Sequence, residues 1–73
     1  MRFFFDIIDG TNQIGDSEGT DLIDDGAAQS EGFAIVSELC REFPGRFQHG
    51  AVLEVYSEDR RRVMAIPISA PRL

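Results

Sequence analysis

The sequence contains no lysine, one cysteine, one histidine and no long apolar run, and each shortage excludes a class of protein. The single cysteine, Cys40, cannot form an intramolecular disulfide, so we expect a chain that folds in the reducing cytoplasm. The apolar start of the chain is interrupted by Asp6 and Asp9, too early for a signal peptide or a membrane span. We therefore expect a soluble protein without a membrane anchor.

Positive charge is scarce and unevenly placed. The chain has 13 acids against 7 arginines, which gives a net charge of −6. This balance opposes general binding to nucleic acid, because phosphate contacts need clustered positive side chains. Residues 1–44 carry a net charge of −8 and residues 45–73 carry +2. Such a division can orient a partner or pair two copies of the chain head to tail.

A chain of 73 residues is long enough for one small domain and too short for two, so we expect residues 1–73 to fold as one unit. Residues 3–8 are aromatic and β-branched and stop at an Asp-Gly pair, which predicts a strand and a turn. The polar, glycine-rich stretch that follows predicts a short return strand over residues 12–15. A further bridge is expected near residues 20–22.

One helix is predicted over residues 27–43. Asp24 or Asp25 can accept hydrogen bonds from its first amides, and a Pro-Gly pair ends it. Apolar residues recur along this segment every three or four positions and form one stripe. The stripe includes Gly32, which weakens a helix by up to about 1 kcal/mol relative to alanine but allows close approach to a sheet.

Residues 52–56 and 63–68 predict a second hairpin around a charged turn. Pro67 has no amide hydrogen to donate, so the last strand should lie at a sheet edge. The predicted fold is α+β, with the order β-β-α-β-β, a four-stranded antiparallel sheet and one helix packed on one face. The strand orders 2-1-3-4 and 1-2-4-3 both keep every neighbour antiparallel, and both remain open.

An aromatic first segment that ends in Asp9-Gly10, followed by the Asp-x-Glu-Gly turn of residues 16–19, resembles a family of short uncharacterised proteobacterial proteins. That family is classed as a domain of unknown function. The resemblance extends over nearly the whole chain, including an alanine-containing helix and a closing hairpin. It implies a fold and a bacterial source, but no activity.

The acidic residues of the first hairpin are the candidate metal ligands. Asp16, Glu18 and Asp21 offer the carboxylate oxygens that Ca²⁺ or Mg²⁺ prefers. Their spacing does not match a calcium loop, and an aspartate three residues before Gly19 also fits a turn held by local amides. We favour the turn and expect no bound metal or cofactor.

Nucleophiles and bases are too few to assemble a catalytic centre. His49 stands in a glycine-flanked loop, without a carboxylate or a cysteine at ligand spacing. Cys40 lies near the apolar stripe of the helix, as a core thiol would. We therefore expect a protein that is not an enzyme.

Three consecutive arginines, Arg60, Arg61 and Arg62, suit a phosphate or an acidic partner. Glu58 and Asp59 directly precede them and offset much of their charge. We expect a solvated turn whose arginines meet acids of the same or another subunit, rather than a nucleic-acid contact.

The sheet face away from the helix carries the candidate interaction surface. If Phe3, Phe5 and Ile7 point at the helix, strand alternation sends other apolar side chains to the opposite side. We predict that this surface consists of Phe4, Ile8, Val52, Tyr56 and Val63. One helix cannot cover both faces, and an exposed apolar patch on a small protein usually marks an interaction surface. Alternatively, the sheet twists and these side chains are scattered or partly covered by the glycine-rich loop.

The leading hypothesis for function is a non-enzymatic protein-interaction module, most simply a homodimer joined through this face or an edge strand. A second hypothesis is an acidic regulatory protein that masks a basic, nucleic-acid-binding partner, because the first part of the chain is strongly acidic. A third is a divalent-metal-binding protein that uses the acidic hairpin.

Overall fold

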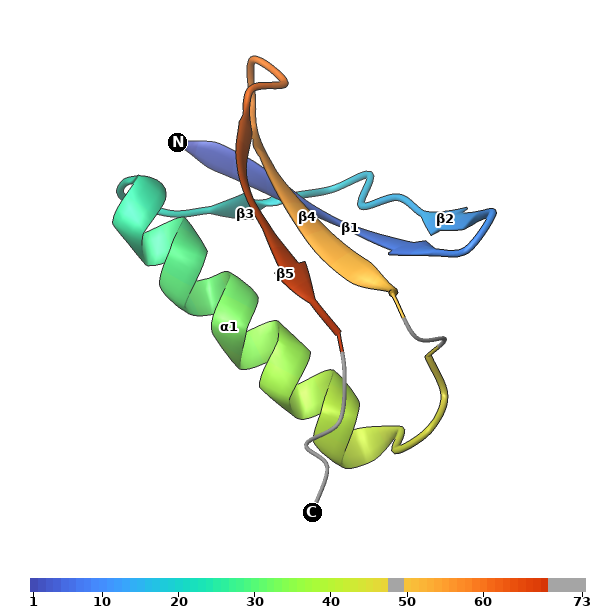
Figure 1. Cartoon of the computed structure of the whole chain (residues 1–73). Coiled ribbons are helices and arrows are strands. Elements are labelled where there is room, and N and C mark those ends of the chain that lie inside the picture. Colours follow the sequence, from blue (N-terminus) through green and yellow to red (C-terminus); the bar gives the residue numbers. More distant parts are fainter. Residues whose placement is uncertain (48–49, 69–73) are drawn as a thin grey trace.

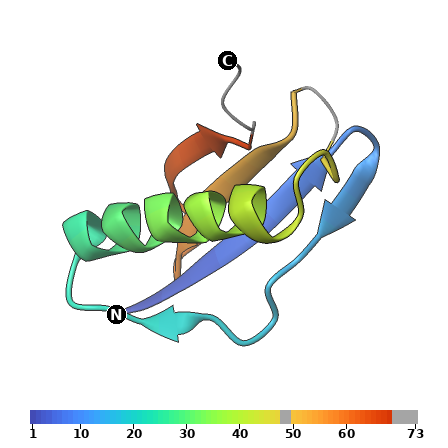
Figure 2. The same ribbon diagram turned by 90° about the horizontal axis from the view of Figure 1, so that it is seen from below.

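The computed structural model describes residues 1–47 and 50–68. In chain order, the elements of this part are β1 (Arg2–Asp9), β2 (Asn12–Ile14), β3 (Thr20–Asp21), α1 (Asp25–Glu42), β4 (Val52–Ser57) and β5 (Arg62–Pro67). They form two layers, in which α1 crosses one face of an antiparallel sheet (Figure 1 and Figure 2). The predicted α+β class is confirmed.

The sheet has the strand order β2-β1-β4-β5, and β3 also pairs with β1, beyond the end of β2. The long strands β1 and β4 form its centre. The predicted count of four strands is wrong, because the described residues form five. After the loop of residues 15–19 the chain returns to β1, where Thr20 pairs with Phe3. Without β3, the order is the first of the two predicted, 2-1-3-4.

The helix α1 begins at Asp25, two residues before the predicted start. The side chain of Asp24 accepts a hydrogen bond of 2.8 Å from the amide of Ala27, which has no partner inside the helix. At the other end, the amide of Phe43 donates to the carbonyl of Leu39 at 2.9 Å. Within the described part of the chain, no helix is both long and apolar enough to cross a membrane.

The core lies between α1 and the sheet. Its most buried apolar residues are Phe3, Ala28, Ala51, Leu53, Val55, Ile66 and Ile68. Gly32 faces these residues, and a Cβ atom on it would lie only 2.9 Å from the Cδ1 atom of Ile66. The close approach of helix and sheet that Gly32 predicts is therefore confirmed.

The strand β5 lies at the edge of the sheet, as Pro67 predicts. The amide of the next residue, Ile68, donates to the carbonyl of Ala51 at 2.8 Å. Because successive residues of an antiparallel strand direct their backbone groups to opposite sides, position 67 faces away from β4. Proline leaves no donor there, so this part of the edge is a poor template for a further strand.

Candidate interaction surface

The sheet face away from α1 carries four apolar or aromatic side chains of the two central strands. They are Phe4 and Ile8 of β1 and Val52 and Tyr56 of β4, which we call the open sheet face, and all four are half-buried. Phe4 lies opposite Tyr56 and Ile8 opposite Val52, so the two pairs stand at opposite ends of this face. They lie outside the cluster that packs against α1.

Val63, the fifth residue predicted for this face, packs with the core instead. The ladder between β4 and β5 shifts there, because Val55 pairs with Met64 while Tyr56 pairs with Arg62. Val63 is the extra residue of this bulge, and an extra residue breaks the simple alternation of sides. The structure therefore places four of the five predicted residues on the open sheet face, as two pairs at its opposite ends, and places Val63 with the core.

A polar band divides the open sheet face. Asp6 and Glu54 lie opposite each other in the ladder, between the two apolar ends. Asp6 is only 4% exposed and accepts a hydrogen bond of 2.9 Å from the amide of Asp16. Glu54 accepts hydrogen bonds from the Tyr56 hydroxyl at 2.5 Å and from Arg62 at 3.2 Å. The hydrogen bond to Glu54 raises the pKa of Tyr56 above its ordinary value, because the carboxylate accepts from the protonated hydroxyl.

Arg60 covers one end of the open sheet face. Its guanidinium carbon lies 4.9 Å from the centre of the Tyr56 ring and 5.8 Å from the centre of the Phe4 ring. Both distances fall within the range of about 6 Å for a cation–π interaction. Within the described residues, no carboxylate pairs with this guanidinium. The Phe4 ring also packs close to Gly19, so the glycine-rich loop covers part of this end.

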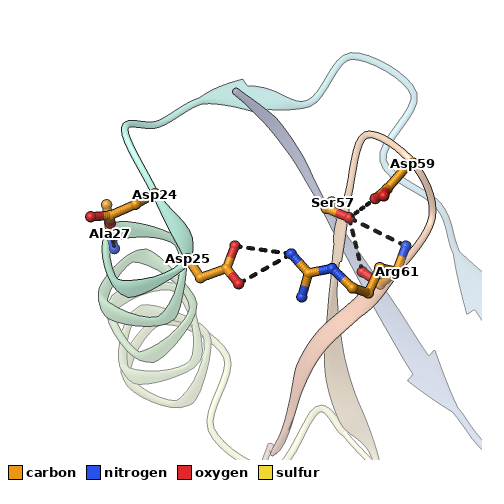
Figure 3. A network of polar contacts seen from close by, with 6 residues as sticks. All are labelled: Asp24, Asp25, Ala27, Ser57, Asp59 and Arg61. Carbon is orange, nitrogen blue, oxygen red and sulfur yellow. Dashed lines mark hydrogen bonds and ion pairs between the residues drawn. The ribbon is translucent and has the colours of Figure 1, made fainter.

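The other two arginines of the turn are paired within the chain. Arg61 contacts both carboxylate oxygens of Asp25 at the start of α1, at 3.1 and 3.3 Å (Figure 3). Arg62 contacts Glu54 at 3.2 Å. The expectation that the arginines meet acids is confirmed for these two, and both acids belong to the same chain.

A buried serine organises the turn that carries the arginines. Ser57 donates its hydroxyl to Asp59, and the hydroxyl oxygen accepts a hydrogen bond of 3.2 Å from the amide of Arg61 (Figure 3). The Ser57 carbonyl accepts from the amide of Arg60, and the Ser57 amide donates to the carbonyl of Arg61, both at 2.9 Å. These bonds define a hairpin loop of three residues. Its last residue, Arg60, has a φ of 66°, the left-handed conformation that such loops usually assign to glycine.

Asp16 holds the first loop together. Its carboxylate accepts hydrogen bonds from the amides of Phe5 at 3.1 Å, Glu18 at 3.3 Å and Gly19 at 3.0 Å. The Phe5 amide lies between the part of β1 that pairs with β2 and the part that pairs with β3. The Asp16 carboxylate gives this amide a hydrogen-bond acceptor there. Burial raises the pKa of Asp16, but these hydrogen bonds outweigh it and the pKa is lowered. The predicted turn is confirmed, and Gly19 has a positive φ of 76°.

The other two candidate metal ligands have partners of a different kind. Asp21 pairs with Arg2 at 3.3 Å, and the backbone carbonyl of Glu18 accepts a hydrogen bond of 2.5 Å from the same arginine. Within residues 1–47 and 50–68, no three histidine, cysteine, aspartate or glutamate side chains are arranged to hold a metal ion. Backbone amides and Arg2 thus hold the acidic hairpin.

Of the two residues considered for nucleophilic or acid–base chemistry, the structure describes Cys40. Cys40 packs against the core from α1, as predicted for a thiol near the apolar stripe. His49 lies outside the described residues.

The sequence carried signals for the features that were not predicted. Asp6 and Glu54 alternate in phase with Phe4 and Tyr56, so the polar band follows from the pleat alone. The role of Arg60 could not be predicted in this way, because residue 60 takes the left-handed conformation only if the hairpin loop contains three residues. That loop length depends on the pairing across the second hairpin.

These features define a small α+β domain whose sheet has one face covered by a helix and one open, amphipathic face. The chain belongs to the family described as a domain of unknown function (DUF6894), whose sequence model matches residues 2–69. No curated protein and no solved structure matches the chain. The predicted membership of a domain-of-unknown-function family is thus confirmed.

Proposed function

We propose that the chain is a protein-interaction module without enzymatic activity, and that it forms a homodimer through the open sheet face. The observation that carries this proposal is the set of half-buried side chains, Phe4, Ile8, Val52 and Tyr56, on the face that α1 leaves uncovered. Removing apolar surface from water contributes about 25 cal/mol per Å². A second copy that covers these side chains gains this contribution, which offsets the entropy that two chains lose on association.

The sheet edges are less suited to the contact than the face. The edge strand β5 lacks a donor at Pro67, and on the opposite side β2 has three residues and β3 has two. Short edges and proline at an edge are features that discourage strand addition. Of the two contacts considered from the sequence, the face is thus the better supported.

The size of the chain is compatible with a dimer of this kind. The described residues expose 5011 Å². A stable interface buries about 800 Å² on each partner, which is roughly a sixth of this surface. In a two-fold dimer both copies use the same patch, so one face of each copy is sufficient.

Sedimentation equilibrium over a concentration series tests the homodimer. We expect the wild type to reach the mass of a dimer, and Tyr56→Asp to weaken the dimer at least about tenfold, because it places a charge in the contact. Phe33→Asp is the matched control, since this phenylalanine of α1 is 55% exposed and lies outside the proposed contact. Both variants should keep the circular dichroism of the helix. A wild type that stays monomeric at every concentration contradicts the proposal.

The other functions considered from the sequence have weaker support. Three carboxylates of the acidic first part of the chain, those of Asp21, Asp25 and Glu38, are already paired with arginines of the same chain. A cytoplasmic location rests on the single cysteine, and a bacterial source on the family resemblance. Both stay predictions.

A further inference from the structure

Arg60 occupies a position where an arginine is conformationally unfavourable. It is the one residue other than glycine with a positive φ within the described part of the chain. A left-handed backbone brings the Cβ atom of an L residue too close to the following carbonyl, whereas glycine adopts it freely. Backbone strain that a glycine would remove points to a function for the side chain.

The side chain at this strained position lies on the proposed contact surface. The guanidinium of Arg60 stacks over Tyr56 and Phe4, while those of Arg61 and Arg62 are paired with acids. A cation–π contact uses the charge of a guanidinium but not its five N–H donors. The donors of Arg60 therefore remain available to a planar acceptor such as a carboxylate.

We propose that Arg60 determines the specificity of the open sheet face by binding a carboxylate of the second copy of the chain. This inference rests on the homodimer proposed above. Charge supports a second copy as the occupant, because residues 1–44 carry −8 while the segment that contains Arg60 carries +2. Each copy thus supplies both the cation and an excess of acids. In a two-fold pair the contact forms twice, and burial against the aromatic rings strengthens it relative to an exposed ion pair.

The variant Arg60→Gly distinguishes a loss of this contact from a loss of stability of the fold. Glycine is relaxed at a positive φ, so at protein concentrations where both proteins are monomeric the variant should unfold at the same urea concentration as the wild type or at a higher one. The dissociation constant of the dimer should nevertheless rise at least about tenfold, the equivalent of about 1.4 kcal/mol and of one charge-assisted hydrogen bond. Destabilisation of the fold is thereby excluded as the cause of the lost association.

Two further measurements distinguish a contact between Arg60 and a carboxylate from a contact that the aromatic rings make alone. Arg60→Lys keeps the charge but loses the planar fork, so its dissociation constant should lie between those of the wild type and Arg60→Gly. Raising NaCl from about 0.05 M to about 0.5 M should weaken the wild-type dimer more than the Arg60→Gly dimer, because salt screens the contact that only the wild type has.

The outcomes are distinguishable. If the wild type dimerises and Arg60→Gly dimerises equally well, the role of Arg60 is overturned while the homodimer stands. If Arg60→Gly weakens the dimer but salt affects both proteins equally, the carboxylate is overturned and the rings alone make the contact. If the wild type is monomeric throughout, the homodimer itself is overturned.

Discussion

Gly19 and Gly45 share the same positive φ but differ in surroundings, which makes them a matched pair for a test of packing. Both have a φ of 76°. A Cβ atom on Gly19 would lie 2.9 Å from the carbonyl oxygen of Phe3 and 2.9 Å from the ring of Phe4, whereas nothing lies within 4 Å of one on Gly45. Alanine therefore meets the same unfavourable φ at the two positions, and only at Gly19 does it also clash.

The expected losses in the free energy of unfolding are the sum of a backbone cost and a packing cost. A left-handed backbone costs alanine about 1–2 kcal/mol. At Gly19 the added methyl group displaces packed atoms, which usually costs a further 1–3 kcal/mol or so. The Phe3 carbonyl belongs to the central strand β1 and cannot shift without disturbing the sheet. We expect Gly45→Ala to lower the free energy of unfolding by about 1–2 kcal/mol and Gly19→Ala by about 2–5 kcal/mol.

Urea unfolding followed by far-ultraviolet circular dichroism measures both losses. A chain of this length has a total stability of roughly 4–11 kcal/mol, so a loss of about 2–5 kcal/mol in Gly19→Ala should lower the urea midpoint measurably. All proteins are compared at one concentration, because self-association adds to apparent stability. Equal losses for the two variants would refute the close packing of Gly19 against β1.

Two further predictions concern polar contacts. Asp16→Asn should lower the free energy of unfolding by about 1–2 kcal/mol at pH 7, because the amides of Phe5 and Gly19 lose a charged acceptor. Since the pKa of Asp16 is lowered by folding, its stabilising contribution is complete above about pH 4 and is lost as the pH falls further. Urea titrations should thus show the gap between wild type and variant closing in acid, and a gap that persists there would contradict this account. Arg61 and Asp25 are both partly exposed, so a double-mutant cycle of Arg61→Ala and Asp25→Ala should yield a coupling below about 1 kcal/mol, and a larger value would mean that this ion pair anchors the hairpin to α1.

Much of the fold was predictable from the sequence, because its signals act between neighbours in the chain. Asp24 caps the helix through an amide three residues away, and Pro67 marks an edge through its own missing hydrogen. The alternation of residues 3–8 separates a core face from an open face without reference to any other strand. The family resemblance likewise depended on short local motifs.

Sequence alone determined the helix, the two hairpins, the edge strand and the residues of the two central strands that alternate onto the open sheet face. The tertiary structure decided the rest, since it depends on the register between segments far apart in the chain. The gap between β2 and β3, the shift that turns Val63 toward the core, and the loop length that places Arg60 over Tyr56 are all consequences of pairing. Hydrogen bonds between strands set these registers, and no local signal in a single chain specifies which amide meets which carbonyl.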